Sequence, residues 1–143
     1  MRIEDEIQKL GPLKNVAAAI VDYAQAGAKL SKSEFHCYSG EWTLEPDDWI
    51  NLKFVYTNKY RIHVSLGVYP TTLDSIECLE IKPGRLPNWS KISIENVLQL
   101  PEVMNCLETA YYISDNGYRS KNGKSERPEK IRQASNIFVG FKS

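Results

Sequence analysis

The feature that most constrains this fold is a regular alternation of apolar and polar residues on both sides of Asn58. A turn centred on this residue brings the apolar positions of the two arms opposite one another, as Ile50 with Leu66, Leu52 with Val64 and Phe54 with Ile62. Successive side chains of a strand point to opposite faces, so a shift of one residue would destroy this match. The sequence therefore predicts a β-hairpin over residues 50–68 with one apolar and one polar face.

A second hairpin is predicted before the first one. A turn at Ser39-Gly40 pairs apolar residues of its two arms, Cys37 with Trp42 and Phe35 with Leu44. The polar residues of both arms then lie on the other face. A fifth strand is predicted over residues 75–82, and Pro83-Gly84 ends it. These strands follow one another along the chain, which favours an antiparallel meander.

Two amphipathic helices flank the predicted strands. Pro12 is tolerated in the first turn of a helix, and apolar residues then recur every three or four positions. This helix should end near Gly27, because glycine is typical of helix C-termini. Pro101 likewise suits a helix start, and an apolar stripe runs from Val103 to about Ser114.

Four other segments have weaker patterns. Residues 1–10 would form a short separate helix before the Gly11-Pro12 break, and residues 92–100 fit either a short helix or an edge strand. Residues 117–130 are polar without periodicity, which predicts a mobile basic loop. Residues 137–141 are too apolar for a free tail, so we expect a last strand or a docked segment there.

Length and composition favour one domain. A chain of 143 residues with 42% hydrophobic residues can bury one core. We therefore predict an α+β fold with a single globular domain over residues 1–143. Its centre would be an antiparallel meander sheet of about five strands, with an N-terminal and a C-terminal amphipathic helix packed on one face.

The sequence also bears on the compartment. No apolar run approaches the roughly 20 residues that span a bilayer, and the N-terminus opens with acidic residues. Cys37, Cys78 and Cys106 are odd in number, widely spaced and without a C-x-x-C motif. This pattern is typical of buried thiols in a reducing cytoplasm. We expect a cytoplasmic protein that is neither secreted nor inserted into a membrane.

The polar face of the hairpin over residues 50–68 is the first candidate site. The predicted register brings together five side chains that can donate hydrogen bonds: Asn51, Lys53, Arg61, His63 and Ser65. Lys53 lies opposite His63, and Asn51 lies opposite Ser65. Such a cluster predicts a site for an anionic partner. An ordinary solvated sheet face has the same residue types, so that interpretation stays open.

The charges of the chain are unevenly distributed although its formal net charge is zero. Residues 1–118 hold eleven basic and sixteen acidic residues, whereas residues 119–143 hold seven and two. The basic residues that could neutralise phosphates are Arg119, Lys121, Lys124, Arg127, Lys130 and Arg132. No aromatic residue is interleaved among them, so this segment offers no base stacking. A sequence-independent nucleic-acid binder is the first alternative, and a loop against the acidic body is the simpler interpretation.

A second alternative is a divalent-metal-dependent nuclease. Pro46-Asp47 followed by Glu80-Ile81-Lys82 superficially resembles the P-D…E-x-K signature of such enzymes. The resemblance implies that Asp47 and Glu80 bind the cation and that Lys82 assists the attacking water. With twelve Glu and twelve Lys, however, chance alone gives about one E-x-K. In a meander, Asp47 would begin one strand and Glu80 would end a parallel one, roughly 20 Å apart.

Other chemistry lacks a motif in this sequence. The glycine-rich signatures of nucleotide binding and of α/β-hydrolases are absent. His36 and His63 are the only histidines, and the adjacent His36 and Cys37 would point to opposite faces of a strand. We therefore predict a non-catalytic binding or protein-interaction module without metal or cofactor, whose partner is a protein or a small ligand. A homodimer would also fit, since exposed sheet edges of small domains often find a partner.

Overall fold

The structure is a computed structural model, and it describes residues 2–27, 33–46, 48–70, 73, 80–84 and 89–113. The loop expected over residues 117–130 and the last strand expected over residues 137–141 lie outside these ranges. The described elements are helices and one six-stranded antiparallel sheet, which confirms the predicted α+β fold. In the described part of the chain, no helix is both long enough and apolar enough to cross a membrane.

The sheet has the strand order β1-β2-β3-β4-β6-β5. Its strands are β1 (Glu34–Tyr38), β2 (Glu41–Glu45), β3 (Ile50–Val55), β4 (Arg61–Leu66), β5 (Ile81–Pro83) and β6 (Ser90–Ile94). All neighbouring pairs are antiparallel. The first four strands form the predicted meander, and the two remaining strands extend the sheet beside β4.

Both predicted hairpins are confirmed in the predicted register. Leu52 lies opposite Val64 in the β3–β4 pair, and Cys37 lies opposite Trp42 in the β1–β2 pair. The turn residues explain why the register is unambiguous, because Ser39-Gly40 and Asn58 adopt the positive φ angles that tight turns between strands require. Turn chemistry and apolar alternation therefore point to the same pairing.

The N-terminal helices follow the predicted break. Helix α1 (Ile3–Ile7) leads into the 3-10 helix η1 (Gln8–Leu13), which is kinked at Gly11, with a φ of 55° and a ψ of −122°. Helix α2 (Lys14–Ala26) follows and ends at Gly27, as expected. After the last described strand in the chain, the 3-10 helix η3 (Val97–Gln99) precedes α3 (Leu100–Ile113).

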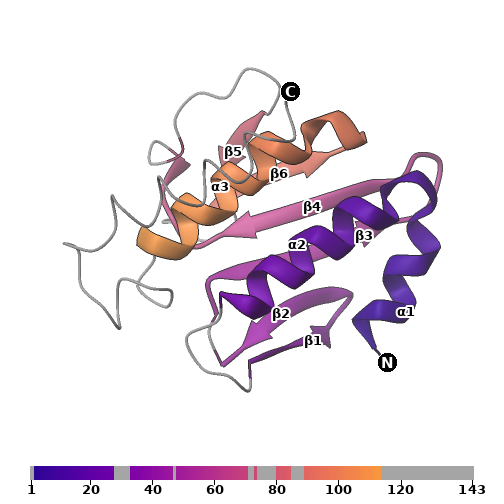
Figure 1. Ribbon diagram of the computed structural model, residues 1–143, viewed down its shortest axis with the longest axis horizontal. Helices are drawn as coiled ribbons and strands as arrows, with labels where there is room; N and C mark the ends of the chain where they lie inside the picture. Colours follow the sequence, from indigo (N-terminus) through magenta and orange to yellow (C-terminus); the bar gives the residue numbers. More distant parts are fainter. Residues whose placement is uncertain are drawn as a thin grey trace.

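The core lies between the helices and one face of the sheet. Every second residue of the central strands is buried, including Ile50, Leu52, Ile62, Val64 and Ile92. These residues belong to one cluster with the apolar stripes of α2 and α3. Figure 1 shows α2 (indigo to purple) and α3 (orange) lying over the same face. We call the opposite face of the sheet, over which no described helix lies, the open face.

Residues 75–79 of the fifth strand expected over residues 75–82 lie outside the described ranges. The last two residues of the expected strand belong to β5, which is not the neighbour of β4. Within residues 92–100, the short helix that the sequence left open is present only at Val97–Gln99, as η3. The place beside β4 belongs to β6, so residues 90–94 form an inner strand and not an edge strand. The reason is burial, since Ile92 and Ile94 are both fully buried when β6 pairs with β4. Strand β5 is short and takes the edge, where Pro83, which has no N–H to donate, is tolerated.

Candidate functional site

The open face carries the polar residues that the sequence singled out. Asn51 and Lys53 come from β3, and Arg61, His63 and Ser65 come from β4, all with side chains on the side away from the core. None of the five is buried, in contrast to the residues between them on each strand. The predicted residues therefore do come together, in the middle of the sheet rather than at its rim.

His63 lies at the centre of this group. Its ring nitrogen Nδ1 is 2.8 Å from Oγ of Ser93, the residue directly opposite on β6. This contact fixes the orientation of the imidazole ring in either tautomer, because the serine hydroxyl can donate to Nδ1 or accept from it. The sequence did not identify Ser93, because residues 92–100 could not be assigned to a strand and its partner was therefore unknown.

Three cationic side chains surround His63, and we call Lys53, Arg61 and Lys91 the cation triad. Lys53 is directly opposite His63, Arg61 is two residues away on the same strand, and Lys91 is the diagonal neighbour on β6. Such positions place Cβ atoms about 5 to 8 Å from that of the histidine. Burial lowers the pKa of His63, and the positive charges of the triad lower it further.

The cation triad lacks counter-ions within the described ranges. Arg2, Lys9, Lys59 and Lys82 each form an ion pair with a glutamate, whereas no residue of the triad forms one with a described residue. The Nε atom of Arg61 is buried and has no hydrogen-bond partner among the described groups. Among the described residues, the three charges of the triad are therefore not neutralised by a direct ion pair.

Two hollows on the open face meet at His63 and Lys91. One, of about 420 Å³, also lies over Asn51, Lys53 and Ser65. The other, of about 410 Å³, also lies over Arg61, Ser93 and Gln99. The open face is thus indented on both sides of the histidine, so a bound group can contact the triad from more than one direction.

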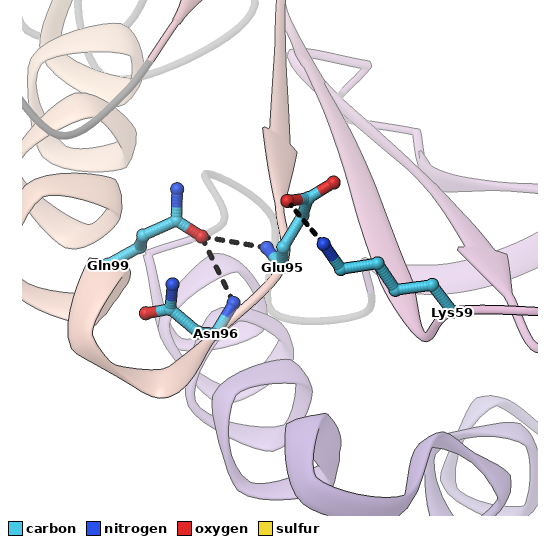
Figure 2. A network of polar contacts seen from close by, with 4 residues as sticks. All are labelled: Lys59, Glu95, Asn96 and Gln99. Carbon is cyan, nitrogen blue, oxygen red and sulfur yellow. Dashed lines mark hydrogen bonds and ion pairs between the residues drawn. The ribbon is translucent and has the colours of Figure 1, made fainter.

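The rim of the second hollow is built by a polar network between two chain segments far apart in sequence (Figure 2). Gln99 Oε1 accepts hydrogen bonds from the backbone N–H groups of Glu95 at 2.7 Å and Asn96 at 3.1 Å. Asn96 Oδ1 in turn accepts from the N–H of Leu98 at 2.9 Å, which completes a capping box for η3. Lys59 pairs with the Glu95 carboxylate at 3.0 Å.

We expect Gln99→Ala to lower the free energy of unfolding by about 1 kcal/mol, because two backbone N–H groups lose their acceptor. Lys59→Ala should change it by less than about 0.5 kcal/mol, since the Lys59–Glu95 pair is solvent-exposed and screened. Urea unfolding of the two variants measures this difference. Equal costs for both would show that the capping box contributes no more than the exposed ion pair.

The other candidates of the sequence are not assembled by the described residues. Asp47 lies outside the described ranges, and Glu80 does not end a strand as expected but precedes β5, at the opposite edge of the sheet from β1. Because β6 lies between β4 and β5, the strands do not form the simple meander from which a separation of Asp47 and Glu80 was expected. No group of three or more metal-ligating side chains occurs among the described residues. The basic residues from Arg119 to Arg132 are all outside the described ranges.

The histidine–cysteine pair is separated as expected. His36 is exposed on the open-face side of β1, whereas Cys37 is half-buried and packs against the core. Neither Cys37 nor Cys106 forms a disulfide bond with a described residue, and Cys78 is outside the described ranges.

The chain was compared with models of known protein families, with curated proteins and with solved structures, and none of the three comparisons gives a match.

Proposed function

We propose that this protein is a non-catalytic binding module that holds an anionic group of its ligand on the open face, beside His63. The observation that carries the proposal is the cation triad, three positive side chains around one histidine without a described counter-ion. A bound anion would supply the missing negative charge. Hydrogen bonds between charged groups are about twice as strong as those between neutral groups, so these side chains are well suited to hold it.

The neighbours of the triad favour binding over catalysis. Ser93 and His63 are the only nucleophile and base in contact among the described residues of the open face, and they are simply opposite each other on adjacent strands. No described carboxylate orients the other ring nitrogen of His63, and such a third group usually activates a serine. The hydroxyl groups of Ser65 and Ser93 and the amide of Asn51 are instead suited to hydrogen-bonding a ligand.

Sulfate is a suitable probe, because its charge does not change between about pH 5 and 8. A bound sulfate should raise the pKa of His63 towards or above its ordinary value of 6.5, since negative charge favours the protonated ring. Binding then takes up a proton, so affinity must increase as the pH falls below about 6.5. We expect NMR titrations to show a raised pKa for His63 in sulfate and a lower Kd at about pH 5.5 than at about pH 8, at constant ionic strength.

His36 on the edge strand β1 is an internal control for this experiment, and sulfate should leave its ring signals unchanged. Lys53→Ala should weaken sulfate binding about tenfold, whereas Lys14→Ala, which removes an exposed cation from α2, should leave it unchanged. If sulfate moves neither His63 signal, or if both lysine variants weaken binding equally, the open face is not an anion site.

A further inference from the structure

The two edges of the sheet differ in how well they are protected from pairing with a further strand. Strand β5 has only three residues and includes Lys82 and Pro83, features that discourage pairing at an edge. Strand β1 has five residues and contains neither lysine nor proline. We infer that two copies of this chain associate through β1, by antiparallel pairing of one β1 with the other. This inference concerns a different surface from the proposed anion site and does not depend on it.

The backbone of β1 has hydrogen-bonding groups that the sheet does not use. Tyr38 and Glu41 flank the two-residue turn at Ser39-Gly40, so their backbone groups bond to each other, and this pattern repeats at every second residue of β1. The N–H and C=O groups of Phe35 and Cys37, which alternate with these positions, therefore point away from β2. No described residue bonds to these outward groups. A strand added at this edge would supply their partners.

There is room for such a strand beside β1. Figure 1 shows β1 as the outermost strand, at the lower margin of the sheet. A hollow of about 520 Å³ lies along the beginning of β1, lined by Glu34, Phe35 and His36 together with Arg2 and Gln25 from the helical segments. Every second side chain of an added strand points towards the helices, so these side chains can enter the hollow.

The edge of β1 is complementary to itself. When a two-fold axis passes through His36, Phe35 of each copy lies opposite Cys37 of the other, and each outward N–H of one copy meets an outward C=O of the other. A two-fold axis through Phe35 would instead place Cys37 opposite Ser33, and an axis through Cys37 would place Phe35 opposite Ser39. Ser33 and Ser39 both lie outside β1. The register centred on His36 is therefore the one in which the two strands satisfy each other completely.

The side chains are also compatible in this register. On the side of the helices, Phe35 meets Cys37 of the second copy, and both are apolar. On the other side, Glu34 lies opposite Tyr38 of the second copy and diagonally next to its His36, so the acidic residues of the two copies do not oppose each other. Residues that face each other across an antiparallel pair lie on the same side of the sheet. The two open faces would therefore form one continuous surface, and the pairing leaves the cation triad of each copy uncovered.

Amide hydrogen exchange, followed by NMR at two protein concentrations, tests the inference. At about 1 mM the amides of Phe35 and Cys37 should exchange about tenfold more slowly than at about 50 µM, because pairing of the copies protects them. The amide of His36, which bonds to β2 within each copy, is the internal control and should be equally protected at both concentrations. Sedimentation equilibrium over the same range should show the mass rising from one chain towards two. A single-chain mass throughout, or association that leaves the amides of Phe35 and Cys37 unprotected, would overturn the inference.

A charge placed at the two-fold axis tests the register. His36→Lys brings two ammonium groups face to face in the pair of strands, so it should weaken association about tenfold. His36 is exposed in the single chain, so this change should leave the fold intact. Asn15→Lys adds the same charge at an exposed position of α2, and as the matched control it should leave association unchanged. Equal association of the two variants would show that the copies do not meet at His36 and would contradict the proposed pairing.

Discussion

Replacing Leu52 with alanine is expected to lower the free energy of unfolding by about 2 to 5 kcal/mol. Leu52 is fully buried in β3, an inner strand of the sheet. It lies directly opposite Val64 on β4 and Trp42 on β2. Truncation would leave a cavity that these neighbours can only partly fill, because each is held by its own strand pairing. A loss of this size is a large fraction of the stability of an ordinary domain.

The adjacent residue is the matched control. Lys53 lies one position along the same strand, but its side chain is exposed on the open face. Lys53→Ala should therefore change the free energy of unfolding by no more than about 0.5 kcal/mol while it weakens anion binding. Urea unfolding of both variants, monitored by tryptophan fluorescence, measures the difference. Similar losses for the two variants would mean that the two faces of the sheet are not as different as their burial indicates.

The contrast between these neighbours also explains why much of the fold is predictable from the sequence. Strands with one buried face have side chains that alternate with a period of two, and the turn residues Asn58 and Gly40 restrict where the chain can reverse. Both signals are local, within about ten residues of one another. The registers of the two hairpins and the end of α2 at Gly27 were predictable for this reason.

The place of β6 was not predictable in the same way. Ile92 and Ile94 alternate with polar residues over only five positions, which is too short to separate a strand from a helix. Their partner, β4, lies about thirty residues earlier in the chain, and no tight turn connects the two strands. The choice is therefore made by tertiary packing, which buries both isoleucines against the helices.

The residues of the candidate site likewise fall into a predictable and an unpredictable group. The residues contributed by β3 and β4 were predictable, because one hairpin sets their positions. Lys91 and Ser93 come from β6, so their contact with His63 depends on the long-range pairing. Without Lys91 the cluster would be an ordinary pair of cross-strand cations. The third cation and the serine hydroxyl make it a site that surrounds the histidine.

Gly11→Ala is the second change for which we expect a large loss, about 2 to 4 kcal/mol in the free energy of unfolding. Gly11 combines a φ of 55° with a ψ of −122°, which only glycine adopts without strain. A Cβ atom at this position would also lie 2.9 Å from Cε2 of Tyr60, which is closer than two non-bonded carbon atoms approach. The kink at Gly11 thus lets η1 pack closely against the residue that precedes β4, and alanine would disturb both.

Two controls separate the backbone strain from the collision with the ring. Gly40 also has a positive φ, 81°, but a Cβ atom there would meet nothing within 4 Å, so Gly40→Ala should cost only the strain, about 1 to 2 kcal/mol. In a Tyr60→Ala background, Gly11→Ala should likewise cost less than it does in the unmodified chain, because the ring is gone while the strain remains. Thermal or urea unfolding of the four variants of this cycle measures the coupling between positions 11 and 60. A coupling near zero would show that the tyrosine ring yields freely, and that the demand for glycine at this position comes from the backbone alone.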